Sequence, residues 1–173
     1  MIEIENTFAE AFPMKASRLI ITALNINWAK KAALSFCGFA TSVIACGCEA
    51  GIESELSHKE TPDGRPGVSI LIFSMSSNEL KKQILNRTGQ CIMTSPTSAV
   101  FSGNISADKI PLGNSLRYFG DGYQISKFLD NKRFWRIPVM DGEFICEDFA
   151  YQMKGIGGGN FLVLGNNIES VLG

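Results

Sequence analysis

Hydrophobic and polar positions along the first part of the chain follow two different periods. Residues 17–24 form an apolar run rich in β-branched side chains, which predicts a buried strand. The next apolar positions recur at helical spacing over residues 28–36, behind Asn25 and Asn27, which are favourable N-cap residues. Gly38 is expected to end this helix. The chain therefore opens with a predicted strand and a predicted helix.

The same signals recur further along the chain. Residues 41–46 and 67–74 are apolar runs of strand length, separated by a long polar connection with a strong turn signal. Residues 79–87 have the apolar spacing of a helix, and residues 89–94 are typical of a strand. The β-α-β-β-α-β order predicts an α+β fold of the ferredoxin-like sandwich type, with one antiparallel sheet and both helices on the same face. Four isoleucines should be buried in its single core: Ile20, Ile70, Ile84 and Ile92.

Short β-rich segments dominate the chain after this sandwich. Residues 115–119, 134–139 and 143–146 are predicted strands, and turn residues lie between them. These segments predict an antiparallel β extension of the sandwich.

The C-terminal segment repeats the opening unit. Residues 160–164 predict a buried strand, and a pair of asparagines then precedes a helix that begins at Ile168. We therefore expect residues 1–155 to form an N-terminal lobe and residues 156–173 to be the truncated start of a second, similar lobe. The apolar strand without its partners should also promote self-association.

The composition is that of a folded protein, with 45% hydrophobic and 19% charged residues. The net charge of −1 gives no bulk electrostatic reason to bind nucleic acid or an anionic membrane. The N-terminus carries acids where a secretory signal would be basic. The uncharged stretch 32–48 is short for a membrane span and contains several Gly, Ser and Thr residues. We therefore expect a cytoplasmic protein that does not enter the membrane.

The five cysteines are odd in number, and no pair has the CxxC spacing of a metal site. Cys46 and Cys48 would share one face of a strand, where they could hold a metal together with His58 or form a redox pair. Reduced thiols without a metal are the more common arrangement. We expect free thiols and no bound metal.

Eight short motifs follow one another in the order of a known family. They occupy residues 7–12, 38–46 with 49–52, 61–67, 89–91 with 94–96, 119–124, 135–139, 142–145 and 157–160. An example is the turn sequence Thr-Pro-Asp-Gly-Arg-Pro-Gly at residues 61–67. Each motif alone is weak, but the ordered set resembles the formylmethanofuran–tetrahydromethanopterin N-formyltransferases.

This resemblance implies transfer of a formyl group between methanofuran and N5 of tetrahydromethanopterin, in formaldehyde oxidation or methanogenesis. Acyl transfer between two nitrogens requires a positioned amine, donors aimed at the developing oxyanion and a group that handles the amine proton. Methanofuran and tetrahydromethanopterin are then substrates, and no prosthetic group, metal or redox cofactor is needed. The alternative, from a different class, is a non-catalytic ferredoxin-like module that serves as a binding or assembly subunit.

The resemblance also implies an organisation. Family members are longer, with two ferredoxin-like lobes, and the carboxylate usually assigned a catalytic role lies in the second half. The chain by itself could therefore lack activity. Cys46-Gly-Cys48 and residues 118–122 look like the version found in methylotrophic bacteria, where the protein is a subunit of a formyltransferase/hydrolase complex. A homo-oligomer, or membership of such a complex, is expected.

Two acids are candidates for contact with the pterin. Asp121 and Glu143 each lie beside glycines, where the backbone can approach a ligand closely. A carboxylate at either position could bind the N–H donors of the pterin ring or carry a proton. The alternative is that Asp121 is a turn residue and Glu143 begins an edge strand.

Five further residues complete the predicted substrate-binding site, in which no catalytic residue is identified. Arg65 lies in the turn rich in proline and glycine and could clamp the carboxylates of methanofuran, or be an exposed turn arginine. Gln90, Ser95 and Thr97 flank the end of the predicted fourth strand, where side chains either face a ligand or cap a helix or turn. Glu10 lies between two phenylalanines, in a segment that could form a substrate wall or a subunit contact.

Overall fold

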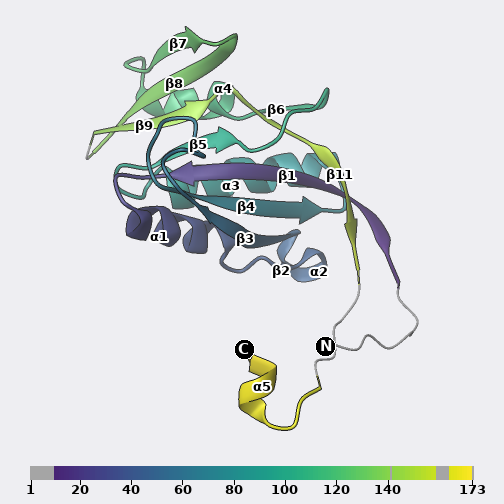
Figure 1. Ribbon diagram of the computed structural model, residues 1–173. Coiled ribbons are helices and arrows are strands. Elements are labelled where there is room, and N and C mark those ends of the chain that lie inside the picture. Colours follow the sequence, from purple (N-terminus) through teal and green to yellow (C-terminus); the bar gives the residue numbers. More distant parts are fainter. Residues whose placement is uncertain (1–9, 141, 159–163, 173) are drawn as a thin grey trace.

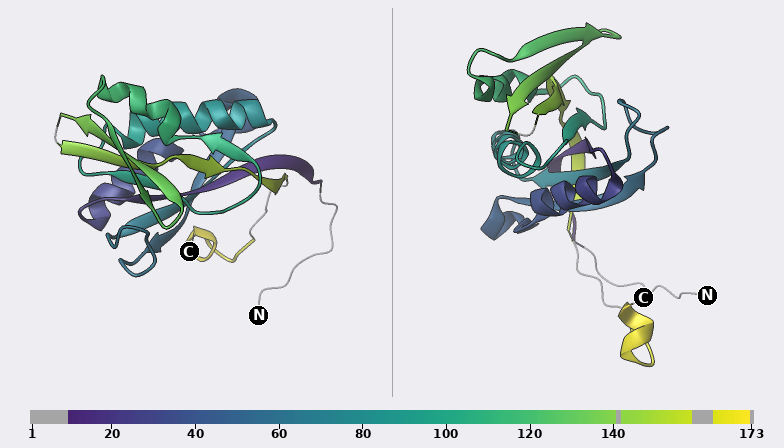
Figure 2. Two further views of the ribbon diagram at one scale, coloured as in Figure 1. Left: turned by 90° about the horizontal axis from the view of Figure 1, so that it is seen from above. Right: turned by 90° about the vertical axis from the view of Figure 1, so that its left-hand side faces the viewer.

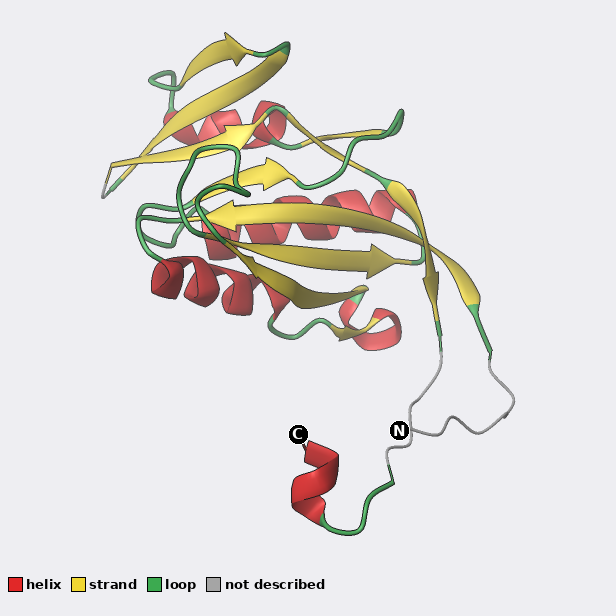
Figure 3. Cartoon of the chain, in the orientation of Figure 1, coloured by secondary structure: helices red, strands yellow, loops and turns green. Residues whose placement is uncertain are grey.

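Residues 10–140, 142–158 and 164–172 are described by the computed structural model of the protein (Figure 1). Over these residues the chain is mixed α+β, with a mostly antiparallel nine-stranded sheet and few helices (Figure 3). The strands are β1 (Phe12–Thr22), β2 (Thr41–Ser42), β3 (Cys48–Leu56), β4 (Gly67–Ser74), β5 (Ala99–Ser102), β6 (Lys109–Pro111), β7 (Ile125–Leu129), β8 (Lys132–Val139), β9 (Gly142–Glu147), β10 (Phe149–Tyr151) and β11 (Met153–Gly157). The helical segments are α1 (Ile26–Cys37), α2 (Val43–Cys46), α3 (Ser77–Arg87), the π-helical turn η1 (Thr88–Ile92), α4 (Gly113–Leu116), the 3-10 turn η2 (Arg117–Gly120) and α5 (Ile168–Leu172).

The strand β1 lies in the interior of the sheet and connects its parts. It pairs antiparallel with β4 on one edge, and β4 pairs antiparallel with β3. On the other edge, the second half of β1 pairs with β5 and the first half with β11, both antiparallel. β5 then joins β9 in parallel, and β8 and β7 continue the sheet in antiparallel order. β6 and β10 form a separate two-stranded sheet.

Side chains on β1 and β4 alternate between two faces, and one face forms the core. Leu19 is paired with Ile70, and both are completely buried. Ile21 and Val68 form the next such pair on the same face. Buried residues of both long helices belong to the same core: Ala29, Ala32, Ala33 and Phe36 of α1, and Leu80 and Ile84 of α3. The helices α1 and α3 therefore cover the same face of the sheet, as expected.

Local sequence explains where these helices begin and end. The side chain of Asn25 accepts a hydrogen bond from the N–H of Trp28, which confirms the predicted N-cap of α1. The N–H of Gly38 donates to the carbonyls of Leu34 and Ser35 and closes the last turn. Helix α3 is capped in the same way by Ser76.

The strand predicted over residues 41–46 is wrong. Only β2 is extended there, and the following residues form α2, which ends at Gly47 with a φ of 73°. The strand next to β4 is β3, inside the segment predicted as a polar connection. Most of its side chains are exposed because it runs near the edge of the sheet, so it lacks the apolar run of a buried strand.

Two further predicted strands are helical. Residues 89–92 belong to η1, which continues α3, and residues 93 and 94 form the turn after it; the strand that pairs with β1 is β5 instead. Residues 115–119 lie in α4 and η2. Short apolar runs bury equally well in a helix or a strand, and Ile92 is completely buried at the end of η1.

Two of the three strands predicted for the β extension are confirmed, and one strand is added. Residues 134–139 and 143–146 lie in β8 and β9 as predicted, and the unpredicted β7 pairs with β8. Of the four isoleucines expected in one core, Ile20 is only half-buried. It lies between Leu19 and Ile21 on β1, so the strand alternation turns it to the opposite face.

The C-terminal helix α5 begins at Ile168, as predicted. The N–H of Ser170 donates to Oδ1 of Asn167 at 2.9 Å, so Asn167 is its cap. No residue of α5 is buried, and the helix lies apart from the sheet (Figure 2). The strand predicted over residues 160–164 lies outside the described residues except for Leu164.

Arg87 joins the ends of the two long helices. Its guanidinium donates from Nη1 to the carbonyls of Phe36 at 2.6 Å and Gly38 at 2.7 Å, and from Nη2 to that of Phe39 at 3.1 Å. The positive charge lies against the C-terminal carbonyls of α1, which carry the negative end of the helix dipole. One side chain thus satisfies carbonyls that the helix itself leaves unpaired.

Replacement of Arg87 by Gln should lower the free energy of unfolding by about 1–2 kcal/mol, because charge-assisted hydrogen bonds to the carbonyls at the C-terminal end of α1 are lost. Lys82→Gln is the matched control on the exposed side of the same helix and should change it by less than about 0.5 kcal/mol. Urea denaturation followed by circular dichroism measures both. Equal stability of the two variants would contradict a role for Arg87 in closing α1.

An ion pair crosses the face of the sheet opposite the helices. Arg18 of β1 donates from Nε and Nη2 to the two carboxylate oxygens of Glu53 at 2.7 and 2.6 Å. Ser69 of β4, which lies between them, donates its hydroxyl to the same carboxylate at 2.7 Å. The hydrogen bonds from Arg18 lower the pKa of Glu53, and the Ser69 bond acts in the same direction.

This depressed pKa predicts a dependence of stability on pH. The folded protein holds the pKa of Glu53 below the ordinary value of 4.5, so its contribution is fully present above that pH and is lost as pH falls through the folded pKa. Glu53→Gln should therefore be less stable than the wild type by about 1 kcal/mol at pH 7. The difference should shrink towards pH 3 in urea denaturation series. A difference that is constant between pH 7 and pH 3 would refute the assignment.

Candidate functional site

The loops at one end of the sheet bring together segments that are far apart in sequence. β1 ends at Thr22, which is paired with Gly67 at the start of β4 and with Ala99 at the start of β5. Ala99 is in turn paired in parallel with Ile145 in the second half of β9, whose first residues extend beyond the start of β5 at the same end. The loops that enter β4, β5 and β9 therefore meet at this end (Figure 1), which we call the loop end of the sheet.

Six of the seven predicted site residues lie in segments at the loop end: Arg65, Gln90, Ser95, Thr97, Asp121 and Glu143. Arg65 precedes β4, while η1 and the loop after it lead into β5. The turn after η2 packs on the end of β8, beside the start of β9. Within the described chain only Arg65 and Thr97 are hydrogen-bonded to each other. The seventh residue, Glu10, precedes β1 at the opposite end of the sheet.

A hydrogen-bond network around Arg65 fixes the loop end. Its Nε donates to Oδ2 of Asp63 at 2.7 Å, its Nη1 to the carbonyl of Thr97 at 2.6 Å and its Nη2 to Oγ1 of Thr22 at 3.0 Å. The buried hydroxyl of Thr22 donates in turn to Oδ2 of Asp63 at 2.7 Å. The backbone N–H of Leu24 donates to Oγ1 of Thr97 at 3.0 Å. The network ties the turn at 61–67 and the loop before β5 to the end of β1.

Arg65 is therefore neither a free clamp nor a simple exposed turn residue. An arginine has five N–H donors, and the network leaves one on each terminal nitrogen. Both remaining donors belong to a side chain that is 28% exposed and held in place. Thr97 is bound in the same network with a φ of 60°, a conformation that costs a β-branched residue free energy. Thr22 and Asp63 were not among the predicted site residues, although Asp63 stands in the motif that carries Arg65.

Ser95 and Gln90 differ in their surroundings. The hydroxyl of Ser95 donates to the carbonyl of Cys91 at 2.8 Å, the local capping bond that was the alternative interpretation. Gln90 is exposed in η1, and its side chain makes no hydrogen bond within the described residues. Of the two, Gln90 presents free polar atoms to solvent.

Asp121 and Glu143 lie on either side of the end of β8. Asp121 has a φ of 50° after η2, which is the turn geometry of the alternative interpretation. Glu143 is in β9 and accepts hydrogen bonds from Arg136 of β8, one of them from Nε at 2.8 Å. Both acids are exposed, so either carboxylate is open to a ligand.

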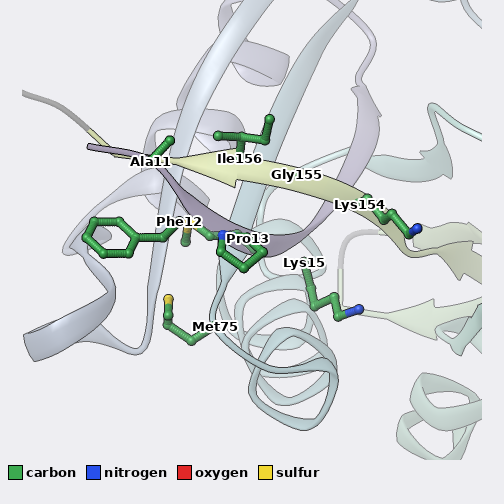
Figure 4. A pocket seen from close by; sticks show the side chains of 9 residues that line it. Ala11, Phe12, Pro13, Lys15, Met75, Lys154, Gly155 and Ile156 are labelled. Carbon is green, nitrogen blue, oxygen red and sulfur yellow. The ribbon is translucent and has the colours of Figure 1, made fainter. Parts of the chain in front are cut away.

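A groove of about 760 Å³ lies at the opposite end, where β1 and β11 pair beyond the rest of the sheet. Its walls are mainly apolar: Phe12, Pro13, Met14, Met75 and Ile156 (Figure 4). The side chains of Lys15 and Lys154, which are register partners on the two strands, extend to the same side of it. Glu10 is exposed just before this groove and does not line it.

The cysteines do not form the strand pair considered above. Cys46 ends α2 and Cys48 begins β3, with Gly47 between them in the left-handed conformation. Burial raises the pKa of the Cys37 thiol to about 11 and also raises the pKa of Cys48, so both stay protonated at neutral pH. All five cysteines are free.

Two further features are absent from the described part of the chain. No group of three or more His, Cys, Asp or Glu side chains in it could hold a metal ion. None of its helices is both long and apolar enough to cross a membrane.

Removal of the Asp63 carboxylate should loosen the loop end. Asp63→Ala leaves Arg65 and Thr22 without their shared acceptor, so the amides of Gly64 and Leu24 should exchange with solvent about tenfold faster or more. Lys59→Ala, an exposed position in the same loop, is the control. Mass spectrometry measures the amide hydrogen-exchange rates of both variants. Unchanged exchange in Asp63→Ala would show that the loop is held by other contacts.

The chain is thus a mixed α+β domain whose loop end carries a network of hydrogen-bonded polar side chains. The chain belongs to the formylmethanofuran-tetrahydromethanopterin formyltransferase family, whose model matches residues 1–139.

Individual relatives agree with this assignment. The chain is 61% identical over 171 residues to a formylmethanofuran–tetrahydromethanopterin formyltransferase from Methylococcus capsulatus, a match that covers 99% of this chain and 57% of the relative. It is 54% identical to a subunit of the formyltransferase/hydrolase complex of Methylorubrum extorquens, over 99% of this chain and 57% of that protein. The chain thus spans somewhat more than half the length of these relatives.

Solved structures match the fold. The crystal structure of the Methylorubrum extorquens formyltransferase/hydrolase complex with methylofuran superimposes with a TM-score of 0.91 at 52% identity, over 98% of this chain and 57% of that one. The formylmethanofuran:tetrahydromethanopterin formyltransferase of Methanosarcina barkeri gives a TM-score of 0.93 at 43% identity, over 99% and 58%.

Proposed function

We propose that the chain takes part in the transfer of a formyl group between formylmethanofuran and N5 of tetrahydromethanopterin. The observation that carries this proposal is the 61% identity over 171 residues to a formyltransferase with these substrates in its name. The close match in fold to the Methanosarcina barkeri enzyme, with a TM-score of 0.93, supports it.

The loop end suits the demands of this reaction. Acyl transfer between two amines depends on holding both reactants in a fixed geometry. Arg65 offers two N–H donors from a fixed guanidinium, a geometry that fits a carboxylate of methanofuran. Asp121 and Glu143 provide exposed carboxylates that can accept from the pterin N–H groups or take up the proton of the amine.

The remaining predicted residues have supporting roles in this proposal. Gln90 contributes a free amide beside the pterin, while Ser95 and Thr97 shape the loop that carries it. Glu10 contacts substrate or a neighbouring subunit beside the apolar groove. The substrates are methanofuran and tetrahydromethanopterin, and the chain carries no prosthetic group of its own.

We infer a two-lobe organisation. Residues 1–155 form a ferredoxin-like lobe, which the antiparallel order β3-β4-β1-β5 with both helices on one face supports. Residues 156–173 begin a second lobe, in agreement with the Asn167-capped helix α5 and with a match to 57% of the Methylococcus relative. The lobe works in the cytoplasm, a location that the five free thiols favour because thiols stay reduced there. It acts within a homo-oligomer or within a formyltransferase/hydrolase complex like that of Methylorubrum extorquens.

The competing proposal is a non-catalytic subunit used for binding or assembly. It rests on the same fold and on the name of the Methylorubrum extorquens relative, which is a subunit of a complex. A chimera separates the two: residues 1–173 replace the matching part of the Methylococcus capsulatus protein, whose remaining portion completes the chain. The formyl transfer rate is measured from formylmethanofuran to tetrahydromethanopterin.

We expect the chimera to be active, and Arg65→Met within it to lower kcat/KM by about tenfold or more through loss of a charge-assisted hydrogen bond. Lys59→Met is the control in the same loop and should leave the rate unchanged. A chimera that folds like the parent enzyme but transfers no formyl group would favour the binding subunit. If the chimera is active and Arg65→Met does not change its activity, the assigned reaction stands but Arg65 has no role in it.

A further inference from the structure

A polar pocket of about 510 Å³ lies where the start of α3 faces β1 and β6. Three lysines from three elements line it: Lys15 of β1, Lys81 of α3 and Lys109 of β6. None of them belongs to an ion pair within the described chain. Asp108 is the acid among its lining residues, so three positive charges face one negative charge. We call this site the lysine pocket.

The lysines are held near one another by the fold. Lys109 has its ammonium 5.1 Å above the ring of Phe149, a cation–π contact that restricts its side chain. Lys15 is half-buried, and its register partner Lys154 adds another ammonium on the same side of the β1/β11 pair (Figure 4). Like charges placed together repel, and an anion bound between them removes that repulsion.

The helix α3 directs its N-terminus at the same pocket. Ser77 and Asn78, the first residues of this eleven-residue helix, are among the lining residues. The first N–H groups of a helix have no partner inside it. In α3, the hydroxyl of the capping residue Ser76 accepts a hydrogen bond from the N–H of Glu79. The N–H groups of Ser77 and Asn78 and the positive end of the helix dipole are thus available to an anion.

The side-chain amide of a largely buried residue completes the pocket independently of the lysines and the helix. Gln152 lines it and is only 7% exposed. Its backbone N–H and carbonyl are bonded to Asp108 and Ser106, but its side-chain amide has no hydrogen-bond partner within the described residues. The amide is not among the fully buried atoms without a partner, so it stays accessible to solvent and can hydrogen-bond to a ligand that enters the pocket.

We propose that the lysine pocket binds an oxyanion of the phosphate class, a use beyond formyl transfer. Three compact ammonium groups, free helix N–H groups and one amide donor converge without any arginine. Arginine binds carboxylate and phosphate alike through its planar fork, whereas separate lysine ammonium groups are common phosphate ligands that act as point charges, and phosphate can accept from several donors arranged around it. The pocket lies away from the loop end, so its occupant need not touch Arg65 or Glu143.

Isothermal titration of the full chain with inorganic phosphate at low ionic strength tests this site. Removal of the two exposed lysines in Lys81→Gln/Lys109→Gln should weaken binding by about tenfold, because each contributes a partly screened charge interaction. Lys82→Gln, one position further along α3 and outside the pocket, is the matched control and should bind as the wild type does. Equal binding by the double variant and the wild type, or an equal loss in Lys82→Gln, would overturn the proposal.

Two further binding measurements distinguish a specific phosphate site from non-specific attraction of anions to positive charge. Gln152→Glu places a carboxylate in the pocket and should weaken phosphate binding far more than Gln90→Glu, which adds the same charge at the loop end. Thermal unfolding shows whether Gln152→Glu has folded, and the lysine variants decide the question if it has not. Glutarate should bind more weakly than phosphate; tighter binding of glutarate would assign the pocket to carboxylates instead. The outcome is independent of whether the chimera transfers formyl groups.

Discussion

The sheet on which both polar sites are built depends on the pairing of β1 with strands on both of its edges. β4 carries β3 and β2 on one side, while β5 carries β9, β8 and β7 on the other, and β11 extends the pairing of the first half of β1. An interior strand has to pair its backbone groups on both sides. Pro13 is consistent with this constraint, because it lies where β1 pairs with β11 but not yet with β4. Moving β1 by one residue would exchange its two faces and separate the helices from their core.

Two polar regions lie near the two ends of β1, and they differ in how their charged side chains are paired. At its C-terminal end, Thr22 anchors the Asp63–Arg65–Thr97 network, in which charges are paired and donors largely used. Near its N-terminal end, Lys15 contributes to a pocket in which the lysines have no ion-pair partner within the described residues. The first arrangement stabilises loops, and the second leaves electrostatic free energy available to a ligand.

The paired network also bears on the proposed chemistry. A side chain that is already held by three hydrogen bonds needs little reordering when a substrate arrives, so little entropy opposes binding. The same rigidity restricts what Arg65 can reach, since its two remaining N–H groups point where the network directs them.

The sequence by itself determined the elements whose signals are local. The helices α1 and α3, the strands β1 and β4 and the Asn25 and Asn167 caps were predictable because a run of apolar residues or a cap acts within a few positions. The ordered motifs also identified the family. The tertiary structure alone decided that β3, with exposed and mostly polar side chains, is a strand and that residues 89–92 are helical. Both depend on which neighbour lies beside the segment: β4 supplies hydrogen bonds to β3, and the core buries Ile92 from η1. The same holds for the sites, since neither the partners of Arg65 nor the meeting of Lys15, Lys81 and Lys109 exists until strands distant in sequence are paired.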